Sequence, residues 1–392
     1  MLIDRAIRSQ VLAAFRQSPA LTLAGPRQSG KTTLLRTLFP DAAYVHLEEP
    51  DVLEFARSDP RGFLRAHREP LILDEIQYAP DLLPYIKAAI DDDRTRRGRF
   101  LLTGSQSLVL LESMTESLAG RTIYLNLLPL AAGEILETAN SSPVSELIFR
   151  GFYPELHAAP ELASHESTTR WQASYVRTFI ERDVRRISNV GDLVQYERFL
   201  RLASGRTAQL LNYSELGRDA GVDQSTARRW LSVLEAGFVT FRLLPSYTNF
   251  SKRLVKSPKI YFQDVGLCRY LMGLREASQL PMNQAFGALF ETLVIGDVRK
   301  QMENTGTGGE LSFFRSSDGL EVDLLISRGS ETRALEIKAT ATPTAAHTAS
   351  LRKWMELSGT KEAVILCLVE KETPLGHGIR AVPWWDHPRT WQ

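Results

Sequence analysis

An α/β fold, with a parallel sheet covered by helices on both faces, is predicted for about the first 130 residues of this 392-residue chain. Two observations predict it. Short apolar runs of strand length alternate with segments of helical periodicity. In addition, the first apolar run, residues 21–24, leads directly into a glycine-rich turn and a helix. Strands that alternate with helices form parallel sheets, because each helix returns the chain to the same edge of the sheet.

The elements follow from local patterns in chain order. Residues 4–16 have the periodicity of an amphipathic helix, and a second helix over residues 31–39 carries Leu34, Leu35 and Leu38 as its apolar stripe. The expected strands are residues 21–24, 43–47, 71–73, 100–102 and 123–127. From residue 129 to about 172 the pattern becomes helical, which is typical of a lid or linker.

The turn after residue 24 has the phosphate-binding pattern G-x-x-x-x-G-K-[ST]. Its residues are Gly25, Pro26, Arg27, Gln28, Ser29, Gly30, Lys31 and Thr32, followed by Thr33. The glycines let backbone N–H groups point at phosphate oxygens, Lys31 reaches the β and γ oxygens, and the Thr32 hydroxyl ligates Mg²⁺. The pattern predicts a site for ATP and Mg²⁺, whereas a chance glycine-rich turn is the alternative.

A second motif, Leu-Ile-Leu-Asp-Glu at residues 71–75, supports the nucleotide site. It is an apolar strand that ends in two carboxylates, which is the Walker B arrangement. We expect Asp74 to hold the Mg²⁺ shell and Glu75 to orient or deprotonate the attacking water. A solvated acidic turn is the alternative, and the upstream phosphate loop argues against it.

Two later positions are candidates for contact with the reacting phosphate. The strand at residues 100–102 ends in polar residues, and Ser105 or Gln106 could touch the γ-phosphate or the water as a sensor. Arg121 closes the next helix just before a strand, where ring-forming ATPases place an arginine that reaches a neighbouring subunit. The alternative for Arg121 is a cation that balances the helix dipole. The first interpretation predicts a homo-oligomer, of which a hexamer is one form.

Together these motifs resemble a widespread prokaryotic family of AAA+-type ATPases. The motifs are the phosphate loop, Leu-Ile-Leu-Asp-Glu-Ile-Gln, Leu-Thr-Gly-Ser-Gln and Leu-Ala-Gly-Arg, and the resemblance extends from Ile3 to about Ile379. It implies an ATPase core followed by an uncharacterised region that combines a winged helix with a restriction-endonuclease-like fold. The expected domains are 1–130 for the ATPase core, 131–195 for a helical lid or linker, 196–258 for the winged helix and 259–392 for the nuclease-like domain.

The residues themselves also favour a winged helix. Ser214 can cap a short helix that Gly221 ends, and Asp223 can cap a second helix that stops at Gly237. The expected shared core is Leu216, Ala220, Ala227, Leu231 and Leu234. The outward face of the second helix would present Gln224, Ser225, Arg228 and Arg229, as a recognition helix does to a major groove. A wing strand at residues 238–244 and a basic stretch with Lys252, Arg253, Lys256 and Lys259 would follow. A protein-binding winged helix with solvated arginines is the alternative.

The C-terminal region has the spacing of the PD-(D/E)-x-K nucleases. Asp323 lies in one apolar strand, and Glu336 and Lys338 lie on one face of the next, so a hairpin would bring the three together. Glu291, on an expected helix over residues 290–301, could complete the cluster. Carboxylates in this arrangement could hold a second Mg²⁺, with Lys338 steadying the nucleophile. A surface hairpin with paired Glu and Lys is the alternative, and the fold alone does not establish cleavage.

Composition limits the remaining possibilities. The net charge is only +1, yet residues 171–260 hold fifteen Lys and Arg against eight Asp and Glu, which favours nucleic-acid contact in the middle of the chain. Cys268 and Cys367 are isolated in apolar surroundings, as buried thiols are. No apolar run is long enough to cross a bilayer and the start lacks a signal peptide, so we expect a cytoplasmic protein without a membrane partner.

These features favour an oligomeric ATPase that moves along or remodels DNA, whether duplex, single-stranded or branched. A second hypothesis is a nucleotide switch that controls a nuclease or toxin-like output. A third is a protein-protein scaffold ATPase with no role on DNA. The first two need the same ATP site, and the sequence does not separate them.

Overall fold

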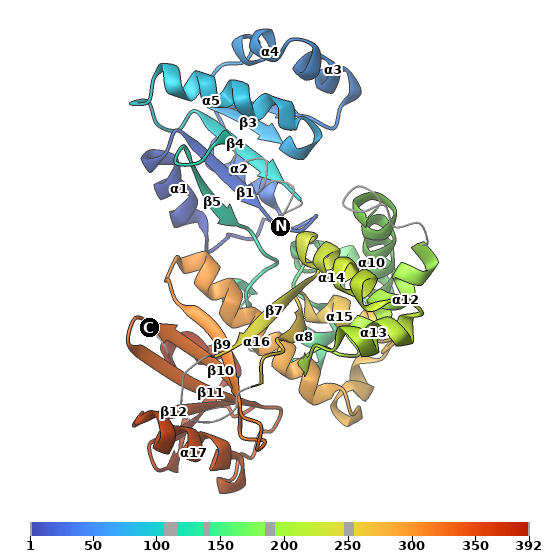
Figure 1. Ribbon diagram of the computed structural model, residues 1–392, viewed down its shortest axis with the longest axis vertical. Coiled ribbons are helices and arrows are strands. Elements are labelled where there is room, and N and C mark those ends of the chain that lie inside the picture. The colour runs from blue at the N-terminus through green and yellow to red at the C-terminus, as the bar shows by residue number, and fades with distance from the viewer. Residues whose placement is uncertain (1, 106–116, 136–141, 185–192, 247–254, 391–392) are drawn as a thin grey trace.

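The computed structural model describes residues 2–105, 117–135, 142–184, 193–246 and 255–390. Figure 1 shows an elongated molecule with an α/β unit at the N-terminal end and a second sheet at the C-terminal end. A group of helices lies beside the region where the two meet. We call residues 2–128 the N-terminal lobe and residues 129–390 the C-terminal lobe.

The N-terminal lobe contains a sheet of five parallel strands in the order β2-β3-β4-β1-β5. The strands are β1 (Ala20–Ala24), β2 (Ala43–His46), β3 (Leu71–Asp74), β4 (Phe100–Gly104) and β5 (Thr122–Asn126). The helices are α1 (Arg8–Gln17), α2 (Lys31–Leu38), α3 (Pro50–Ser58), α4 (Pro60–Ala66) and α5 (Leu83–Asp92). The predicted parallel α/β core is confirmed, although α1 begins four residues later than the sequence pattern suggests.

Strand alternation divides the apolar side chains of this sheet between its two faces. On β3, Ile72 packs with the cluster that contains Leu35 of α2, whereas Leu71 and Leu73 pack with the cluster that contains Ile86 of α5. Because β1, β3 and β4 are buried along their whole length, the sheet is covered on both sides. The carboxyl ends of these strands therefore meet at one edge, where the phosphate loop begins.

The C-terminal lobe combines helices with a nine-stranded mixed sheet in the order β13-β14-β12-β11-β10-β9-β7-β8-β6. The helices are α8 (Val144–Arg150), α9 (Pro154–Ala158), α10 (His165–Thr178), α12 (Leu193–Ser204), α13 (Tyr213–Ala220), α14 (Gln224–Ala236), α15 (Val265–Leu271), α16 (Phe286–Thr305) and α17 (Ala349–Ser358). The strands are β6 (Gln209–Leu210), β7 (Thr240–Pro245), β8 (Lys259–Phe262), β9 (Glu310–Arg315), β10 (Glu321–Arg328), β11 (Glu331–Lys338), β12 (Ala363–Cys367), β13 (Thr373–Gly376) and β14 (Ile379–Pro383).

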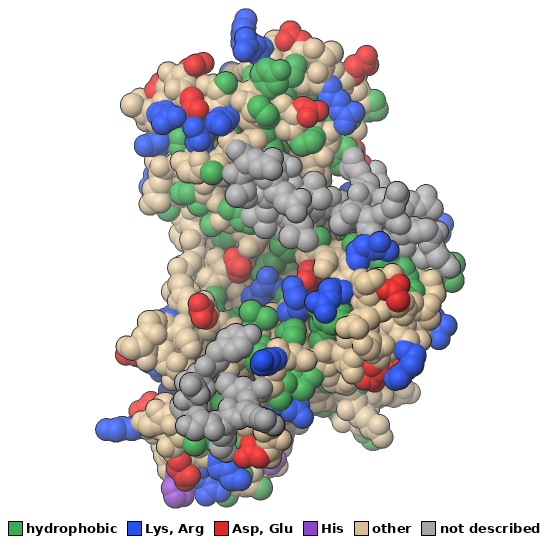
Figure 2. Space-filling model, viewed as in Figure 1, with side chains coloured by type: hydrophobic (Ala, Val, Ile, Leu, Met, Phe, Trp, Pro, Cys, Tyr) green, Lys and Arg blue, Asp and Glu red, His purple; other side chains and the backbone are tan. Residues whose placement is uncertain are grey.

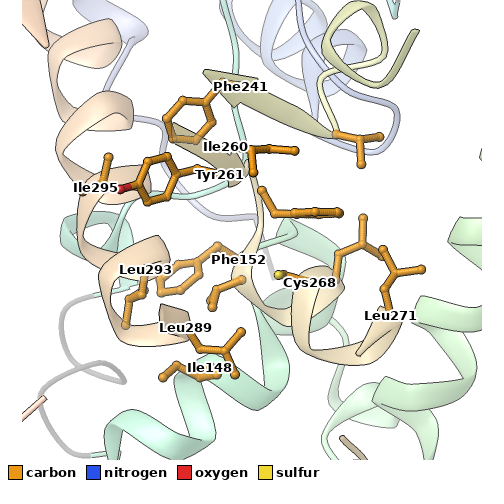
Figure 3. Close-up of a cluster of buried hydrophobic side chains, with 14 of the residues drawn as sticks. Ile148, Phe152, Phe241, Ile260, Tyr261, Cys268, Leu271, Leu289, Leu293 and Ile295 are labelled. Carbon is orange, nitrogen blue, oxygen red and sulfur yellow. The ribbon is translucent and has the colours of Figure 1, made fainter. Parts of the chain in front are cut away.

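The sheet crosses the boundary that the sequence places between residues 258 and 259. Strand β8 begins at Lys259 and pairs with both β6 and β7, and β7 also pairs with β9. One hydrophobic cluster extends from Leu130 to Trp384. In Figure 3, Ile148, Tyr261 and Leu289 belong to this cluster and come from α8, β8 and α16. Segments on both sides of the expected boundary thus share this core, and a second cluster lies between α17 and the C-terminal strands.

The turn between α13 and α14 is close to the one that the sequence predicts. Asn212 caps α13, two residues before the expected Ser214, by accepting a hydrogen bond from a backbone N–H. Gly221 ends α13 with φ of 77°, a left-handed conformation that glycine adopts without strain. Asp223 caps α14, and Gly237 follows its last residue, as predicted. These caps set the ends of α13 and α14.

Candidate functional site

The phosphate loop connects β1 to α2 at the carboxyl edge of the parallel sheet. A Cβ atom on Gly25 would lie 2.1 Å from the carbonyl oxygen of Leu127, so this position accepts only glycine. Gly30 precedes α2 with φ of 92°. Lys31 is buried, and its Nζ donates to the carbonyl oxygens of Gly25 and Pro26, at 2.9 Å each. The loop therefore wraps around its lysine beside the N-terminus of α2.

Asp74, at the end of β3, is the most heavily bonded carboxylate of the N-terminal lobe site. It is 3% exposed and accepts hydrogen bonds from the Thr32 hydroxyl at 2.9 Å and from the Tyr44 hydroxyl at 2.8 Å. The Thr103 hydroxyl also donates to it. Burial and the bond to Asp74 raise the pKa of Tyr44, so its hydroxyl stays a donor. The structure thus brings together Thr32 and Asp74, as predicted, and adds Tyr44 and Thr103.

Glu75 lies directly after β3 with φ of 59°, in a left-handed conformation that is uncommon for this residue type. Its Oε2 accepts hydrogen bonds from Ser105 Oγ at 3.1 Å and from the Gln77 side chain. Gln77 also donates to Ser105 Oγ at 3.1 Å. The expected sensor Ser105 therefore contacts the expected general base. The other sensor candidate, Gln106, lies outside the described residues.

Arg5 is a site residue that the sequence pattern does not reveal. It is buried, and its guanidinium donates to the carbonyl oxygens of Ser29 and Leu128, both at 2.7 Å. Its Nε forms an ion pair of 2.9 Å with Glu134, which also accepts the backbone N–H of Ala131. Arg5 therefore ties the start of the chain, the phosphate loop and the segment after β5 together.

A cavity of 310 Å³ lies beside the phosphate loop. Its wall includes Gln28, Gly30 and Thr33 from the loop and α2. Leu2 and Ile3 near the start of the chain and Pro154 and Ala158 of α9 also line it. The cavity is thus bounded by both lobes.

Arg121 lies at the other edge of the sheet from the phosphate loop. It precedes Thr122, which pairs with Ala20 at the start of β1, whereas the loop follows Ala24 at the end of β1. Its guanidinium forms two hydrogen bonds of 2.9 Å with the carboxylate of Asp91 in α5. Arg121 therefore does not reach the nucleotide site of its own chain, and its trans role stays a prediction.

The outward face of α14 carries the four predicted DNA-contacting residues. Gln224, Ser225, Arg228 and Arg229 are exposed. Five expected core residues are buried beneath them, namely Leu216, Ala220, Ala227, Leu231 and Leu234. The Arg228 guanidinium lies 4.6 Å from the ring centroid of Tyr213, which holds it against α13. Figure 2 shows Lys and Arg side chains gathered around the region where Figure 1 places α14 and β7.

The C-terminal carboxylates also lie close together. Strands β10 and β11 form the predicted antiparallel hairpin, and Asp323 Oδ2 accepts the backbone N–H of Ile337 at 2.8 Å. The Lys338 ammonium lies 2.7 Å from Glu336 Oε1 and 3.5 Å from Asp323 Oδ2. Glu291 projects from α16 toward the same point. We call Glu291, Glu321, Asp323 and Glu336 the carboxylate cluster.

Lys259 does not lie on the basic surface where the sequence pattern places it. It is 2% exposed, and its ammonium lies 3.0 Å from Glu291 Oε1 and 2.6 Å from Glu321 Oε1. Lys252 and Arg253, from the same stretch, lie outside the described residues. Lys259 begins β8, which packs against α16, and its side chain finds its partners on that helix and on β10.

Burial raises the pKa values of two carboxyl groups of the cluster, Glu291 and Glu336. Burial and the charge of Asp323 raise the pKa of Glu291 to about 7 and that of Glu336 to about 8. Burial alone would lower the pKa of Lys259, but Glu291, Asp323 and Glu321 outweigh it and raise that pKa. Within the described ranges, no group of three or more His, Cys, Asp or Glu side chains is arranged to hold a metal ion. Glu291, Asp323 and Glu336 lie close to one another, and a second Mg²⁺ held by them stays a prediction.

Comparison with known proteins defines the class of the N-terminal lobe. A family profile described as an AAA domain matches residues 17–136. Together with the phosphate loop and the parallel sheet, this match identifies an AAA-type P-loop ATPase domain. Profiles for two domains of unknown function match residues 142–278 (DUF8612) and 286–386 (DUF4143).

Two curated relatives are similar along almost the whole chain. They are Uncharacterized protein Rv2008c of Mycobacterium tuberculosis and Uncharacterized protein Mb2031c of Mycobacterium bovis. Each is 31% identical over 385 residues, which cover 98% of this chain and 84% of the relative. The chain belongs to the family of these proteins.

Solved structures show weaker similarity. The Walker-type ATPase PABY2304 of Pyrococcus abyssi matches with a TM-score of 0.47 and 15% identity, over 69% of this chain and 96% of its own. A RuvB variant of Thermotoga maritima matches with a TM-score of 0.31 and 17% identity, over 60% of this chain and 88% of its own.

No helix among the described residues is long and apolar enough to cross a membrane.

Proposed function

We propose that this protein hydrolyses ATP and uses the reaction to move along or remodel DNA. The observation that carries the ATP part is the contact between Thr32 and Asp74 beside the phosphate loop, at 2.9 Å. A hydroxyl and a carboxylate are the hard oxygen ligands that Mg²⁺ prefers, so these residues fit the ion. When bound, Mg²⁺ would neutralise charge on the transferring phosphoryl group.

The other residues of the site support hydrolysis. Lys31 and the N-terminus of α2 would bind the phosphates, and the buried Ser29 hydroxyl, which has no hydrogen-bond partner in the described part of the chain, is a further donor for them. Glu75 would accept a proton from the attacking water, because it follows the Mg²⁺ ligand Asp74 directly. Ser105 and Gln77 hold its carboxylate in place. The cavity beside the loop, bounded by Leu2 and Pro154, would accept the nucleoside part of ATP.

The DNA part of the proposal depends on α14. We assign α13, α14 and strands β7 and β8 to a winged helix, with α14 as the recognition helix. Its exposed face carries Arg228 and Arg229 and no carboxylate between Gln224 and Arg229, so it suits the phosphate backbone and base edges. For residues 286–386, the hairpin that joins Asp323 to Glu336 supports a restriction-endonuclease-like fold.

The proposal also includes a homo-oligomer. Arg121 lies far from the phosphate loop of its own chain and would act on a neighbouring subunit, where an arginine stabilises the charge of the transition state. For that role the Arg121 guanidinium must leave Asp91 and contact the nucleotide that is bound to the neighbouring subunit. Glu75 and Arg121 would then come from different subunits at each active site.

One experiment tests the proposal as a whole. ATP hydrolysis by the full chain is measured with Mg²⁺, alone and with duplex, single-stranded or branched DNA, and a Lys31→Ala variant gives the background rate. Hydrolysis stimulated by one of the DNA forms supports the proposal. Hydrolysis that no DNA changes would favour the scaffold hypothesis, and a rate equal to the Lys31→Ala background would contradict the ATPase part.

A further inference from the structure

The carboxylate cluster of the C-terminal lobe contains a buried cation of its own. Lys259 Nζ lies 3.0 Å from Glu291 Oε1, 2.6 Å from Glu321 Oε1 and 4.0 Å from Asp323 Oδ1. These carboxylates come from α16 and β10, and Lys259 comes from β8. An ammonium group has three N–H donors, and here three carboxylates surround it. Lys259 thus lies at the point where these side chains converge.

The second oxygen of Asp323 is also engaged. Oδ2 accepts the backbone N–H of Ile337 at 2.8 Å and lies 3.5 Å from Lys338 Nζ. Lys338 also lies 2.7 Å from Glu336, and Arg315 lies 3.0 Å from Glu321. Asp323 is the carboxylate that a Mg²⁺ ion between β10 and β11 would require. Both of its oxygens already face cations of the chain itself.

A divalent cation at this point would compete with Lys259 for space and for charge. Mg²⁺ requires oxygen ligands at about 2.0–2.1 Å in octahedral geometry, and Lys259 Nζ lies among the oxygens that would have to supply them. The cluster has four carboxylates, and three cations of the chain, Lys259, Lys338 and Arg315, are in contact with them. Most of its negative charge is therefore balanced without a metal ion. The residues present do not fit Mg²⁺ while Lys259 stays in this place.

We propose that the Lys259 ammonium takes the place of a divalent cation in the carboxylate cluster, so that this nuclease-like site is held together without metal and does not cleave DNA. The lysine joins β8 to α16 and β10, and it thereby links the proposed winged helix to the hairpin that carries Asp323 and Glu336. The inference is independent of the ATP site and of α14. ATP hydrolysis and DNA binding can each succeed or fail without affecting it.

The direct test measures Mn²⁺ binding to the full chain, without nucleotide, by electron paramagnetic resonance. The wild-type protein and Asp323→Asn are expected to bind the same number of Mn²⁺ ions. Lys259→Met, which removes the ammonium and keeps a long side chain, is expected to bind one more. That extra ion should be lost when Asp323→Asn is added. Lys256→Met is the matched control, because Lys256 is exposed in the same segment, and it should match the wild type.

Two results would overturn the inference. One is Mn²⁺ binding by the wild-type protein that Asp323→Asn removes, and the other is a folded Lys259→Met variant that gains no ion. If Lys259→Met does not fold, the number of Mn²⁺ ions bound by the wild type and by Asp323→Asn still tests the inference. A cleavage assay gives a second readout, with duplex, single-stranded and branched DNA in Mg²⁺ or Mn²⁺. No cleavage by the wild type is expected, and cleavage that Asp323→Asn abolishes would contradict the inference.

Discussion

Arg5 donates a hydrogen bond of 2.7 Å to the carbonyl oxygen of Ser29, and this bond fixes the phosphate loop to the beginning of the chain. Arg5→Ala would leave Glu134 buried and without its cation, which costs about 3–5 kcal/mol of stability for such pairs. The loop would also lose its anchor. Since a misplacement of a catalytic group by ~1 Å can cost about 10²-fold in rate, we expect kcat/KM for ATP to fall about 10²-fold. Steady-state kinetics below the unfolding temperature would measure it.

A conservative variant separates positioning from simple loss of stability. Arg5→Lys keeps the charge opposite Glu134 but lacks the planar fork of donors with which Arg5 reaches Glu134, Ser29 and Leu128 at once. It should recover most of the stability and only part of the ATP affinity. Arg16→Ala, on the exposed side of α1, is the control. Equal losses of stability and unchanged KM in both Arg5 variants would contradict a positioning role.

Lys31 and Glu75 should give different phenotypes, because they act on different steps. Lys31→Ala removes the cation that binds the phosphates, so ATP binding should be lost. Glu75→Gln leaves Thr32 and Asp74 intact, so ATP should bind while hydrolysis slows by about 10²–10⁴-fold. Isothermal titration and a phosphate-release assay would measure the two effects. Wild-type turnover in Glu75→Gln would remove Glu75 from the mechanism.

The ion pair between Arg121 and Asp91 allows the trans role of Arg121 to be tested against a structural one. If Arg121 acts on a neighbouring subunit, Arg121→Ala should bind ATP normally and hydrolyse it about 10³-fold more slowly. Asp91→Asn, which weakens the same pair, should keep the rate. Mixing Arg121→Ala with Lys31→Ala protein should restore part of the activity at hybrid interfaces. Equal ATP hydrolysis rates in the wild type, Arg121→Ala and Asp91→Asn, together with a monomer in light scattering, would exclude the trans role.

Local motifs explain why the N-terminal lobe could be predicted. The phosphate loop needs glycine where backbone atoms approach closely, as at Gly25, and an apolar strand before Asp74 is recognisable without its neighbours. Parallel order follows from the alternation of helices and strands. Likewise, Asp223 and Gly221 mark the ends of two helices by their own chemistry.

The features that the sequence did not reveal depend on residues distant in the chain. Arg5 is 129 residues away from its partner Glu134, and Tyr44 is 30 residues away from Asp74. No motif connects such pairs. Lys259 follows other basic residues in the sequence, which favours a solvent-exposed position. Its burial depends on distant segments, because its partners Glu291 and Glu321 lie on α16 and β10. The pairing of β8 with β6 and β7 also carries the sheet across the expected domain boundary at residue 258.

The exposed face of α14 should determine the salt dependence of DNA binding. Arg228→Glu combined with Arg229→Glu removes two cations, and the slope of log affinity against log salt should fall by about 2. The fold should survive, because both side chains are exposed. Arg218→Glu on α13 is the control for a general loss of positive charge. Fluorescence anisotropy over a salt series would measure the slope, and an unchanged slope in the double variant would favour a protein partner for this face.

The carboxylate cluster should make stability depend on pH in an unusual direction. Burial, with the charge of Asp323, raises the pKa of Glu336 from 4.5 to about 8 in the folded protein. Between these values the folded state holds a proton that the unfolded state has lost, so stability falls as pH rises through this window. Glu336→Gln mimics the protonated form and should reduce the slope, giving a protein that is more stable than the wild type at pH 8. Urea unfolding at several pH values would measure this, with Glu331→Gln, an exposed position on the same strand, as the control. A pH slope in Glu336→Gln as steep as that of the wild type would show that Glu336 holds no proton in the folded protein at neutral pH.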